Sequence, residues 1–357
     1  MPTCLVKRVG RSTLSEISKG LQQRVQVNSD PPRKADWRTR VSFSDPACNP
    51  ASHIKMTTQP LGRTGFHATR IGIGDIADRN VPLEECVRTL HRAMDFGLNL
   101  IDTAPGYESG YSEEIVGAAL KGRRDGLFVI DKVDSLLEPV APQVDASLKA
   151  LGVDHTDLFA FHAVSEMEGW EKLAAPGGGM DQLQDCVNAG KTRFRGISSH
   201  SPQVLLAALG SGLCDVVMFP VGPFVDPRYI ELVLPMARQL RAGTVCFKTF
   251  GAGKLLGDTA GYNQPLQERP RGKFSSGGGN SDTAPELPHM SVAECLHYTL
   301  SIGPDVALLG MSFPNEQDAV MEALRSFIPL GADELSNIRV RAKASIEGKG
   351  KCWWNPQ

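Results

Sequence analysis

Residues 99–120 read NLIDTAPGYESGYSEEIVGAAL and hold a strand, a loop and the start of a helix. The apolar residues at the start of the stretch predict a buried strand that ends at Asp102. A Gly- and Pro-containing loop follows and carries Tyr107, and a helical pattern opens at Ser112. A carboxylate is costly to bury alone, so an acid at the end of a buried strand needs a partner.

The same unit recurs along the chain. Apolar strand patterns alternate with helical patterns, several of which end in glycine, the expected helix stop. The strands are expected at Arg70–Gly74, Leu98–Asp102, Leu127–Lys132, Leu158–His162, Arg193–Ser198, Val216–Pro220, Thr244–Lys248 and Val306–Gly310. Continuous apolar strands indicate a parallel sheet buried on both faces.

Eight units close a barrel, so we expect an α/β fold of the (β/α)8 TIM barrel type. An open doubly wound sheet is the rival, and GIGDIA at Gly72–Ala77 loosely fits its glycine-rich turn. That match is weak, because no apolar helix follows it at once.

Three regions are expected along the chain. Residues 1–55 carry ten Lys/Arg against four Asp/Glu and show little periodicity, which predicts a basic, disordered extension. A transit segment and a start at Met56 are the alternatives. Residues 56–330 form the barrel, and residues 331–357 form a helix and a tail that ends in an aromatic pair, Trp353 and Trp354.

Composition limits the class of protein. A net charge of −2 argues against a general nucleic-acid binder, and no apolar stretch reaches the length of a membrane span. The 8 cysteines are scattered with no CxxC pair, which disfavours zinc ribbons and iron–sulfur clusters. Buried single thiols suit a reducing compartment, and no secretory signal opens the chain, so we predict a cytoplasmic location.

Polar side chains end three neighbouring strands. Asp102, Lys132 and His162 end the second, third and fourth strands, and Tyr107 follows Asp102. Each residue alone has an ordinary structural explanation, but strand ends of a barrel converge on one mouth. A phenol has a pKa of about 10, and an adjacent ammonium lowers it. The set therefore predicts a tuned tyrosine acid, with Asp102 as counter-charge to Lys132 and His162 orienting a substrate oxygen.

The sequence resembles the aldo-keto reductase family over about residues 58–328. The resemblance lies in PLGRTG, IDTAPGYESGYSEEIVGAAL, the Lys and His strand ends, RGISSHSP, FKTFGAGKLL and LLGMSFPNEQ. It implies a (β/α)8 barrel with NADP(H) extended across the mouth. It also places the family's catalytic Asp, Tyr, Lys and His on Asp102, Tyr107, Lys132 and His162.

The resemblance also implies a set of cofactor contacts. Serines after the fifth strand would lie near the nicotinamide, the loop after the seventh along the pyrophosphate, and the segment after the eighth at the adenosine end. The implied residues are Gly74, Asp75, Ser198, Ser199, Lys248, Phe250, Gly251, Gly253, Lys254, Leu255, Gly310, Ser312 and Gln317.

The sequence departs from the family at the cofactor. Ser199 replaces the usual Asn, and Met218 and Val221 replace the Gln and the aromatic expected on and after the sixth strand, so stacking falls to Phe219, Phe224 or another residue. Ser312 stands where a cation often pairs with the 2′-phosphate. We expect NADP, with NAD as the alternative and with Lys254, Arg271 or Lys273 as compensating cations.

We therefore predict an oxidoreductase that passes hydride between NADP(H) and an aldehyde, ketone or sugar carbonyl or its alcohol. The expected partner is a small molecule, neither nucleic acid nor membrane, and no metal is expected. The alternative is a weakly catalytic or non-catalytic barrel that binds the cofactor as a redox-sensing regulator. A metal-dependent hydrolase is disfavoured, since no further cluster of His and Asp ends the strands.

Overall fold

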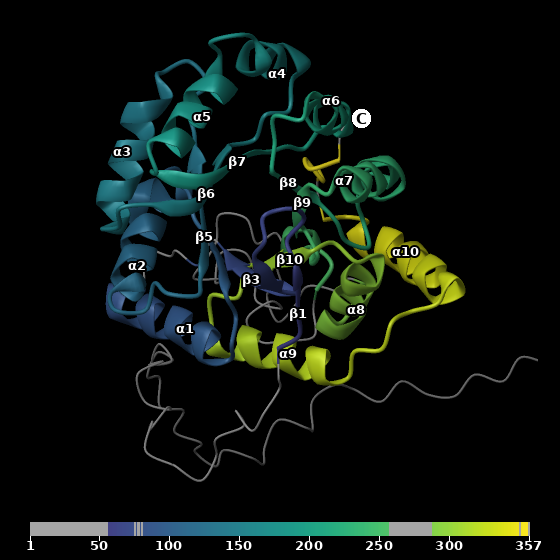
Figure 1. Cartoon of the computed structure of the whole chain (residues 1–357). Coiled ribbons are helices and arrows are strands. Elements are labelled where there is room, and N and C mark those ends of the chain that lie inside the picture. The colour runs from purple at the N-terminus through teal and green to yellow at the C-terminus, as the bar shows by residue number, and fades with distance from the viewer. Residues whose placement is uncertain are drawn as a thin grey trace, which may run out of the picture. The chain divides into compact units, whose positions relative to one another are not determined.

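The eight predicted strands form and close into a parallel barrel in the order β10-β3-β4-β5-β6-β7-β8-β9 (Figure 1). The computed structural model describes residues 56–74, 76, 79, 81–256, 288–349 and 351–355. The predicted extension over 1–55, together with Asp75, Arg271 and Lys273, lies outside these residues. The barrel strands are β3 (Ile71–Gly74), β4 (Leu100–Asp102), β5 (Phe128–Val133), β6 (Thr156–Phe161), β7 (Thr192–Ser198), β8 (Val216–Pro220), β9 (Gly243–Phe247) and β10 (Val306–Leu309).

Side chains alternate between the two faces of each strand, and this decides which ones reach the mouth. On β5, Phe128 and Ile130 fill the barrel interior, whereas Val129 packs outward against the helices. Lys132 continues the inner series, as Asp102 does after Leu100 on β4. The inner face at the carboxyl ends of these strands is therefore polar.

Helices surround the strands, as expected for a TIM barrel (Figure 1). They are α1 (Leu83–Asp95), α2 (Tyr111–Leu120), α3 (Val140–Leu151), α4 (Met167–Ala174), α5 (Gly179–Asn188), α6 (Pro202–Ser211), α7 (Leu234–Leu240), α8 (Val292–Ile302), α9 (Pro314–Arg325) and α10 (Ala332–Ile346), with short helical turns η2 (Tyr107–Gly110), η3 (Tyr229–Val233) and η4 (Gly251–Gly253). Their ends follow the sequence: Ser291 and Glu294 form a capping box on α8, and Gly303 ends it in the left-handed conformation.

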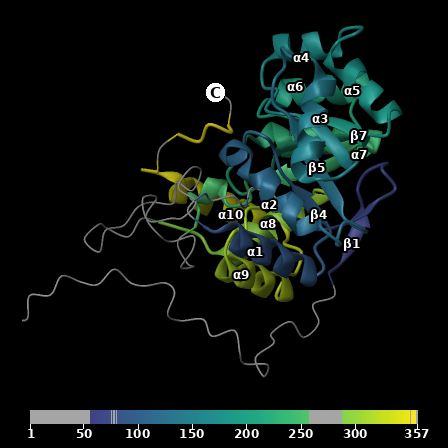
Figure 2. The same ribbon diagram turned by 90° about the vertical axis from the view of Figure 1, so that its left-hand side faces the viewer.

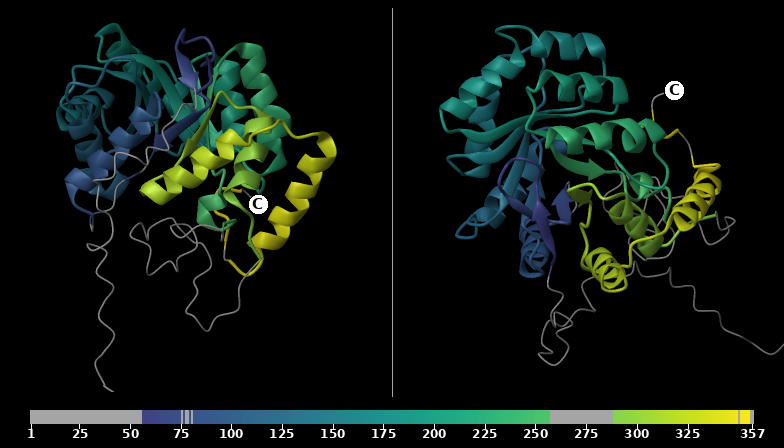
Figure 3. Two further views of the ribbon diagram at one scale, coloured as in Figure 1. Left: turned by 90° about the horizontal axis from the view of Figure 1, so that it is seen from below. Right: turned by 45° about the vertical axis from the view of Figure 1, so that its right-hand side comes forward.

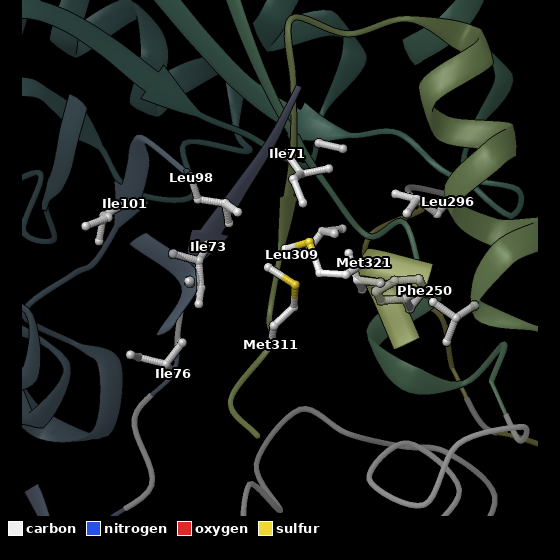
Figure 4. Packing of buried hydrophobic residues seen from close by; sticks show 14 of the residues in the cluster. Ile71, Ile73, Ile76, Leu98, Ile101, Phe250, Leu296, Leu309, Met311 and Met321 are labelled. Carbon is white, nitrogen blue, oxygen red and sulfur yellow. The ribbon is translucent and has the colours of Figure 1, made fainter. Parts of the chain in front are cut away.

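An apolar layer joins the strands to the helices. In Figure 4, Ile73 on β3 and Leu309 on β10 face Met321 of α9 and Leu296 of α8 across one cluster of buried residues. Phe250 belongs to the same cluster and is only 7% exposed. The second half of the barrel has its own outer cluster, built around β6–β9.

An antiparallel hairpin, β1 (Thr58–Pro60) and β2 (His67–Thr69), closes the amino-terminal end of the barrel. Its turn places Leu61 in the barrel interior, and the Gly62 N–H donates to Asp305 before β10. Gly62 has a φ of +49°, and a Cβ there would lie 2.2 Å from the Gly243 nitrogen, so only glycine fits.

The C-terminal segment reaches the opposite end of the barrel from this hairpin (Figures 2 and 3). Trp354 is fully buried, and its indole N–H donates to the carbonyl of Phe224, which follows β8. The Tyr229 hydroxyl donates to the carbonyl of Trp354. The aromatic tail is therefore part of the folded barrel. No helix among the described residues is long and apolar enough to cross a membrane.

Candidate active site

A buried ion pair occupies the mouth end of β4 and β5. The Lys132 ammonium donates to a carboxylate oxygen of Asp102 and, at 2.9 Å, to the carbonyl of Thr103. Both side chains are almost inaccessible to water, at 1% and 3% exposure. Burial raises the pKa of the Asp102 carboxyl, and the bound ammonium opposes that rise. Neither charge is tolerable there without the other.

Tyr107 opens the turn η2 directly above this pair. The Lys132 ammonium lies 5.8 Å from the centre of the Tyr107 ring. The next two residues, Glu108 and Ser109, have φ angles of 47° and 52°, which non-glycine residues rarely adopt. The Arg79 guanidinium donates to both of their carbonyls, at 2.8 and 2.9 Å, and so holds the turn.

His162 follows β6 and completes the predicted group. Its ring meets the Tyr107 ring edge-on, with 5.4 Å between the centroids. Its Nδ1 lies 2.6 Å from Asp134, a carboxylate that the sequence interpretation missed. The structure thus brings Asp102, Tyr107, Lys132 and His162 to one place, with an ammonium beneath a phenol and an imidazole beside it.

Gly74 lies against this group from β3. It pairs with Asp102 in the barrel, and a Cβ on Gly74 would lie 3.2 Å from the Asp102 Cβ. A larger residue would press on the ion pair. Asp75, the next predicted contact, lies outside the described residues.

The predicted nicotinamide serines are engaged with the protein backbone. The Ser198 hydroxyl accepts from the Ala163 N–H at 2.8 Å, and the Ser199 hydroxyl accepts from the Ser201 N–H at 3.0 Å. Both residues are buried. Their hydroxyl oxygens accept hydrogen bonds that hold the loops after β6 and β7. A ligand that contacts these serines would therefore share oxygen atoms that are already hydrogen-bonded.

The loop after β9 divides into core and surface. The side chains of Phe250 and Leu255 belong to the hydrophobic core. Lys254 is 5% exposed, and its ammonium donates to the carbonyl of Lys351 in the C-terminal segment at 2.7 Å. Gly251 and Gly253 have φ angles of 55° and 83°. The groups of this loop that a ligand can contact are therefore backbone atoms and the side chain of Lys248, which is half-buried at the mouth.

The adenosine-end residues fall into two groups. Gly310 is half-buried after β10, and the Ser312 N–H donates to the Glu316 carboxylate at 2.8 Å. The Ser312 hydroxyl is buried without a hydrogen-bond partner among the described residues. Gln317, by contrast, is fully buried, and its amide donates to the Thr89 carbonyl of α1 at 2.9 Å. Its side chain ties α9 to α1 and offers no exposed atom to a ligand.

Phe247 is a second residue that the sequence interpretation missed. It is the last residue of β9. Its side chain lies on the same inner face as that of Val245 and packs at the edge of the barrel interior. Of the two stacking candidates named from sequence, Phe219 is fully buried against Tyr229 outside the barrel, and Phe224 is half-buried after β8. Counting alternate residues onward from the inner-facing Val245 would have singled out Phe247.

An aromatic group surrounds Phe247. The His200 ring lies 5.3 Å from it, Trp353 packs 4.8 Å from His200, and the Lys248 ammonium lies 4.3 Å from the Trp353 ring centre. Burial and the charges of Lys248 and His162 lower the pKa of His200 to about 3. His200 is therefore neutral at physiological pH, and the C-terminal tail lines the mouth.

The fold and the four-residue group define a barrel whose carboxyl-terminal mouth holds a tyrosine, a histidine and a buried lysine–aspartate pair. No three His, Cys, Asp or Glu residues gather as a metal site within the described part of the chain.

Comparison with known proteins agrees with this class. Residues 69–340 match the profile of the Aldo/keto reductase family, and the chain belongs to that family. The resemblance found in the sequence is thereby confirmed, and with it the prediction of an oxidoreductase acting on carbonyl or alcohol groups.

Curated relatives and solved structures point the same way. The aldo-keto reductase YhdN of Bacillus subtilis is 28% identical over 301 residues, covering 73% of this chain and 87% of the relative. The NADH-specific methylglyoxal reductase of Escherichia coli is 31% identical over 211 residues, covering 50% and 63%. An aldo-keto reductase from Bacillus halodurans in its holo form superposes with a TM-score of 0.62 at 22% identity, covering 82% of this chain and 98% of that one, which supports the barrel fold.

Proposed function

We propose that this protein reduces an aldehyde, ketone or sugar carbonyl with a nicotinamide cofactor, or oxidises the corresponding alcohol, with Tyr107 as the general acid–base. The observation that carries the proposal is the buried Asp102–Lys132 pair placed 5.8 Å from the Tyr107 ring and next to His162. A pair of buried charges contributes little stability by itself, whereas an ammonium beside a phenol makes that phenol a better acid.

Each residue then has a definite task. Tyr107 donates its phenol proton to the carbonyl oxygen as charge develops there, and takes it back when the reaction runs toward the ketone. Lys132 stabilises the phenolate that remains, and Asp102 keeps Lys132 charged in its buried position. His162 donates a hydrogen bond to the same oxygen and holds the carbonyl in line.

The mouth fits a nicotinamide cofactor on its β7–β10 side. Buried hydroxyls of Thr249 and Ser312 lack hydrogen-bond partners among the described residues, and they follow the neighbouring strands β9 and β10. We assign the nicotinamide to Phe247 as stacking surface and to Ser198 and Ser199. The phosphates fall to the loop from Lys248 to Leu255, although the N–H groups of Gly251, Gly253, Lys254 and Leu255 already donate within that loop. The adenosine end falls to Gly310 and Ser312. A bound nicotinamide supplies the hydride.

NADP(H) is the proposed cofactor, and NAD(H) remains the alternative. The name of a relative from Schizosaccharomyces pombe carries NADP(+), and an aldo-keto reductase from Klebsiella pneumoniae was solved with NADPH. The methylglyoxal reductase of Escherichia coli is, by its name, specific for NADH. In this chain Lys254 is occupied by the C-terminal segment, so it does not supply the missing cation for a 2′-phosphate.

We also propose a cytoplasmic location. The six cysteines for which the structure gives a state, Cys86, Cys186, Cys214, Cys246, Cys295 and Cys352, are free thiols, which suits a reducing compartment.

The test is NADPH oxidation with a panel of carbonyl compounds, in the parent and in Tyr107→Phe. We expect kcat to fall by roughly 10²- to 10⁴-fold in the variant, with cofactor affinity by fluorescence quenching within twofold. Tyr111→Phe is the matched control, because it removes a nearby phenol whose hydroxyl donates to the Val81 carbonyl instead. Cofactor binding without turnover of any carbonyl in the parent would overturn the proposal in favour of a sensor.

A further inference from the structure

Asp134 connects the two segments that carry Tyr107 and His162. It follows β5 by one residue, and its carboxylate lies 2.6 Å from the His162 Nδ1. The backbone N–H of Gly106, the residue before Tyr107, donates to the same carboxylate. A single acidic side chain from a third segment thus holds both.

Gly106 shows how close this contact is. A Cβ at this position would lie 2.7 Å from the Asp134 Oδ2, closer than real Cβ contacts allow. Its φ of −73° and ψ of −14° suit any residue, so backbone freedom is not why glycine stands here. A side chain at this position would therefore displace the Asp134 carboxylate.

The surroundings of Asp134 favour its ionised form. The hydrogen bonds from His162 and Gly106 and the positive charges of His162 and Lys132 lower the pKa of the Asp134 carboxyl, although partial burial opposes this. The ionisable groups that face His162 from the surrounding segments are Asp134, Tyr107, Asp102 and His200.

A carboxylate on Nδ1 restricts what the other ring nitrogen can do. Because an ionised carboxylate only accepts hydrogen bonds, the nitrogen facing it must carry a proton. In a neutral imidazole the second nitrogen, Nε2, is then an acceptor. Nε2 donates to a carbonyl oxygen only when the ring is protonated on both nitrogens.

We propose that Asp134 is a positioning residue that fixes the proton on His162 Nδ1, so that the imidazolium is the form that donates to the substrate oxygen, and that it sets Tyr107 beside that imidazolium through Gly106. The inference rests on the proposed function for the role of His162 as donor. The carbonyl is thereby oriented by a cation that is itself held by an anion, which suits an oxygen gaining negative charge.

The first test is spectroscopic and does not depend on turnover. Imidazole ¹⁵N NMR, with His162 assigned through His162→Gln, reports which nitrogen carries the proton in the neutral ring. We expect Nδ1–H in the parent. In Asp134→Asn the amide can donate to Nδ1, so we expect the tautomer to switch to Nε2–H. A neutral His162 with Nε2–H in the parent overturns the inference.

The second test is kinetic. We expect Asp134→Ala to lower kcat/KM roughly tenfold to hundredfold, with NADPH affinity within twofold of the parent. Asp134→Asn should retain more activity than Asp134→Ala, and its rate of reduction should fall less between neutral and alkaline pH than that of the parent. Asp154→Asn is the matched control: this Asp also binds a histidine, His155 at 2.7 Å, but at the start of β6, so the pH profile should not change.

Gly106→Ala gives a check that does not remove Asp134. It should lower kcat/KM by crowding the carboxylate, and it should cost nothing further in the Asp134→Ala background. An active parent whose Asp134→Ala and Gly106→Ala variants both behave like it would refute this inference alone. A parent that reduces no carbonyl would refute the proposed function while the NMR result still stands.

Discussion

The strands β4, β5 and β6 bring ionisable side chains to the mouth from their inner faces, whereas the inner-face positions of β7 to β10 hold small, neutral or apolar ones. Asp102 and Lys132 belong to the first side, and Met218 and Phe247 to the second. Both sides use the same inner-face positions of parallel strands. Under the proposed function, one rim of the barrel carries out the proton chemistry while the other provides a surface for a flat, extended ligand.

The two sides also differ in how they bury lysine. Lys132 is paired with a buried carboxylate, whereas the buried Lys254 donates to a neutral carbonyl. We expect Lys132→Met to destabilise the fold by about 3–5 kcal/mol in urea unfolding, because Asp102 is left as an unpaired buried charge. Lys254→Met should cost only about 1–3 kcal/mol. Asp102→Asn combined with Lys132→Met should recover part of the lost free energy of unfolding. Equal losses in Lys132→Met and Lys254→Met would contradict this difference between the two lysines.

The two neighbouring tryptophans of the C-terminal segment test the β8–β9 side of the barrel. Trp354 is fully buried and Trp353 is 51% exposed. Trp354→Ala should lower the free energy of unfolding by about 3–5 kcal/mol through the cavity it leaves. Trp353→Ala should leave stability within about 1 kcal/mol and change KM for the substrate instead. Similar effects of the two substitutions on stability would show that the tail is not anchored as described.

A second acidic group lies behind the ion pair. Asp131 faces outward from β5, next to Glu113 of α2, and burial together with their mutual repulsion raises the pKa of Asp131. Burial raises the pKa of Glu113 as well, although the neighbouring Ser147 and Asp131 side chains oppose this rise. Two buried carboxyl groups side by side repel each other when both are charged, so one of them is expected to carry a proton.

The folded state therefore holds a proton that the unfolded chain releases above about pH 4. Stability should fall as pH rises from there toward the raised folded-state pKa, by up to about 1.4 kcal/mol per pH unit. Glu113→Gln should reduce this slope, because repulsion from Glu113 is lost while burial still raises the pKa of Asp131. Glu114→Gln on the exposed side of α2 is the control. Thermal unfolding of both variants and the parent between pH 5 and 8 measures the pH dependence of stability. The same pH dependence in Glu113→Gln and in the parent would contradict the inference that the two carboxyl groups hold a proton.

The smallest effect is expected at Phe247. If its ring is the stacking surface, Phe247→Leu should weaken cofactor affinity by roughly 2- to 10-fold, in line with about 0.5–1.5 kcal/mol for an aromatic pair. Phe194→Leu, on the inner face farther from the mouth, should leave cofactor affinity unchanged. Fluorescence quenching by NADPH separates the two, and an unchanged affinity in Phe247→Leu moves the stacking surface elsewhere.

Much of this arrangement could be read from local patterns. The strand ends at Asp102 and Lys132 were visible because apolar runs stop there. Phe247 was hidden because an apolar residue at the end of a strand looks like core, and only its inner-face register marks it. Asp134 was hidden because it follows its strand by one residue in a polar loop, where acids are common. Lys254 and Gln317 looked available because sequence does not show that Lys351 and Thr89 lie against them.

Local patterns along the chain were enough to predict the eight strands and helices, the barrel and the four polar residues at its mouth, because these depend on periodicity and on where each apolar run ends. Which polar atoms are already bonded, and which still face the mouth, is set by the folded structure. That depends on contacts between residues far apart in the chain, such as Asp134 with His162 and Gly106, which no local pattern records.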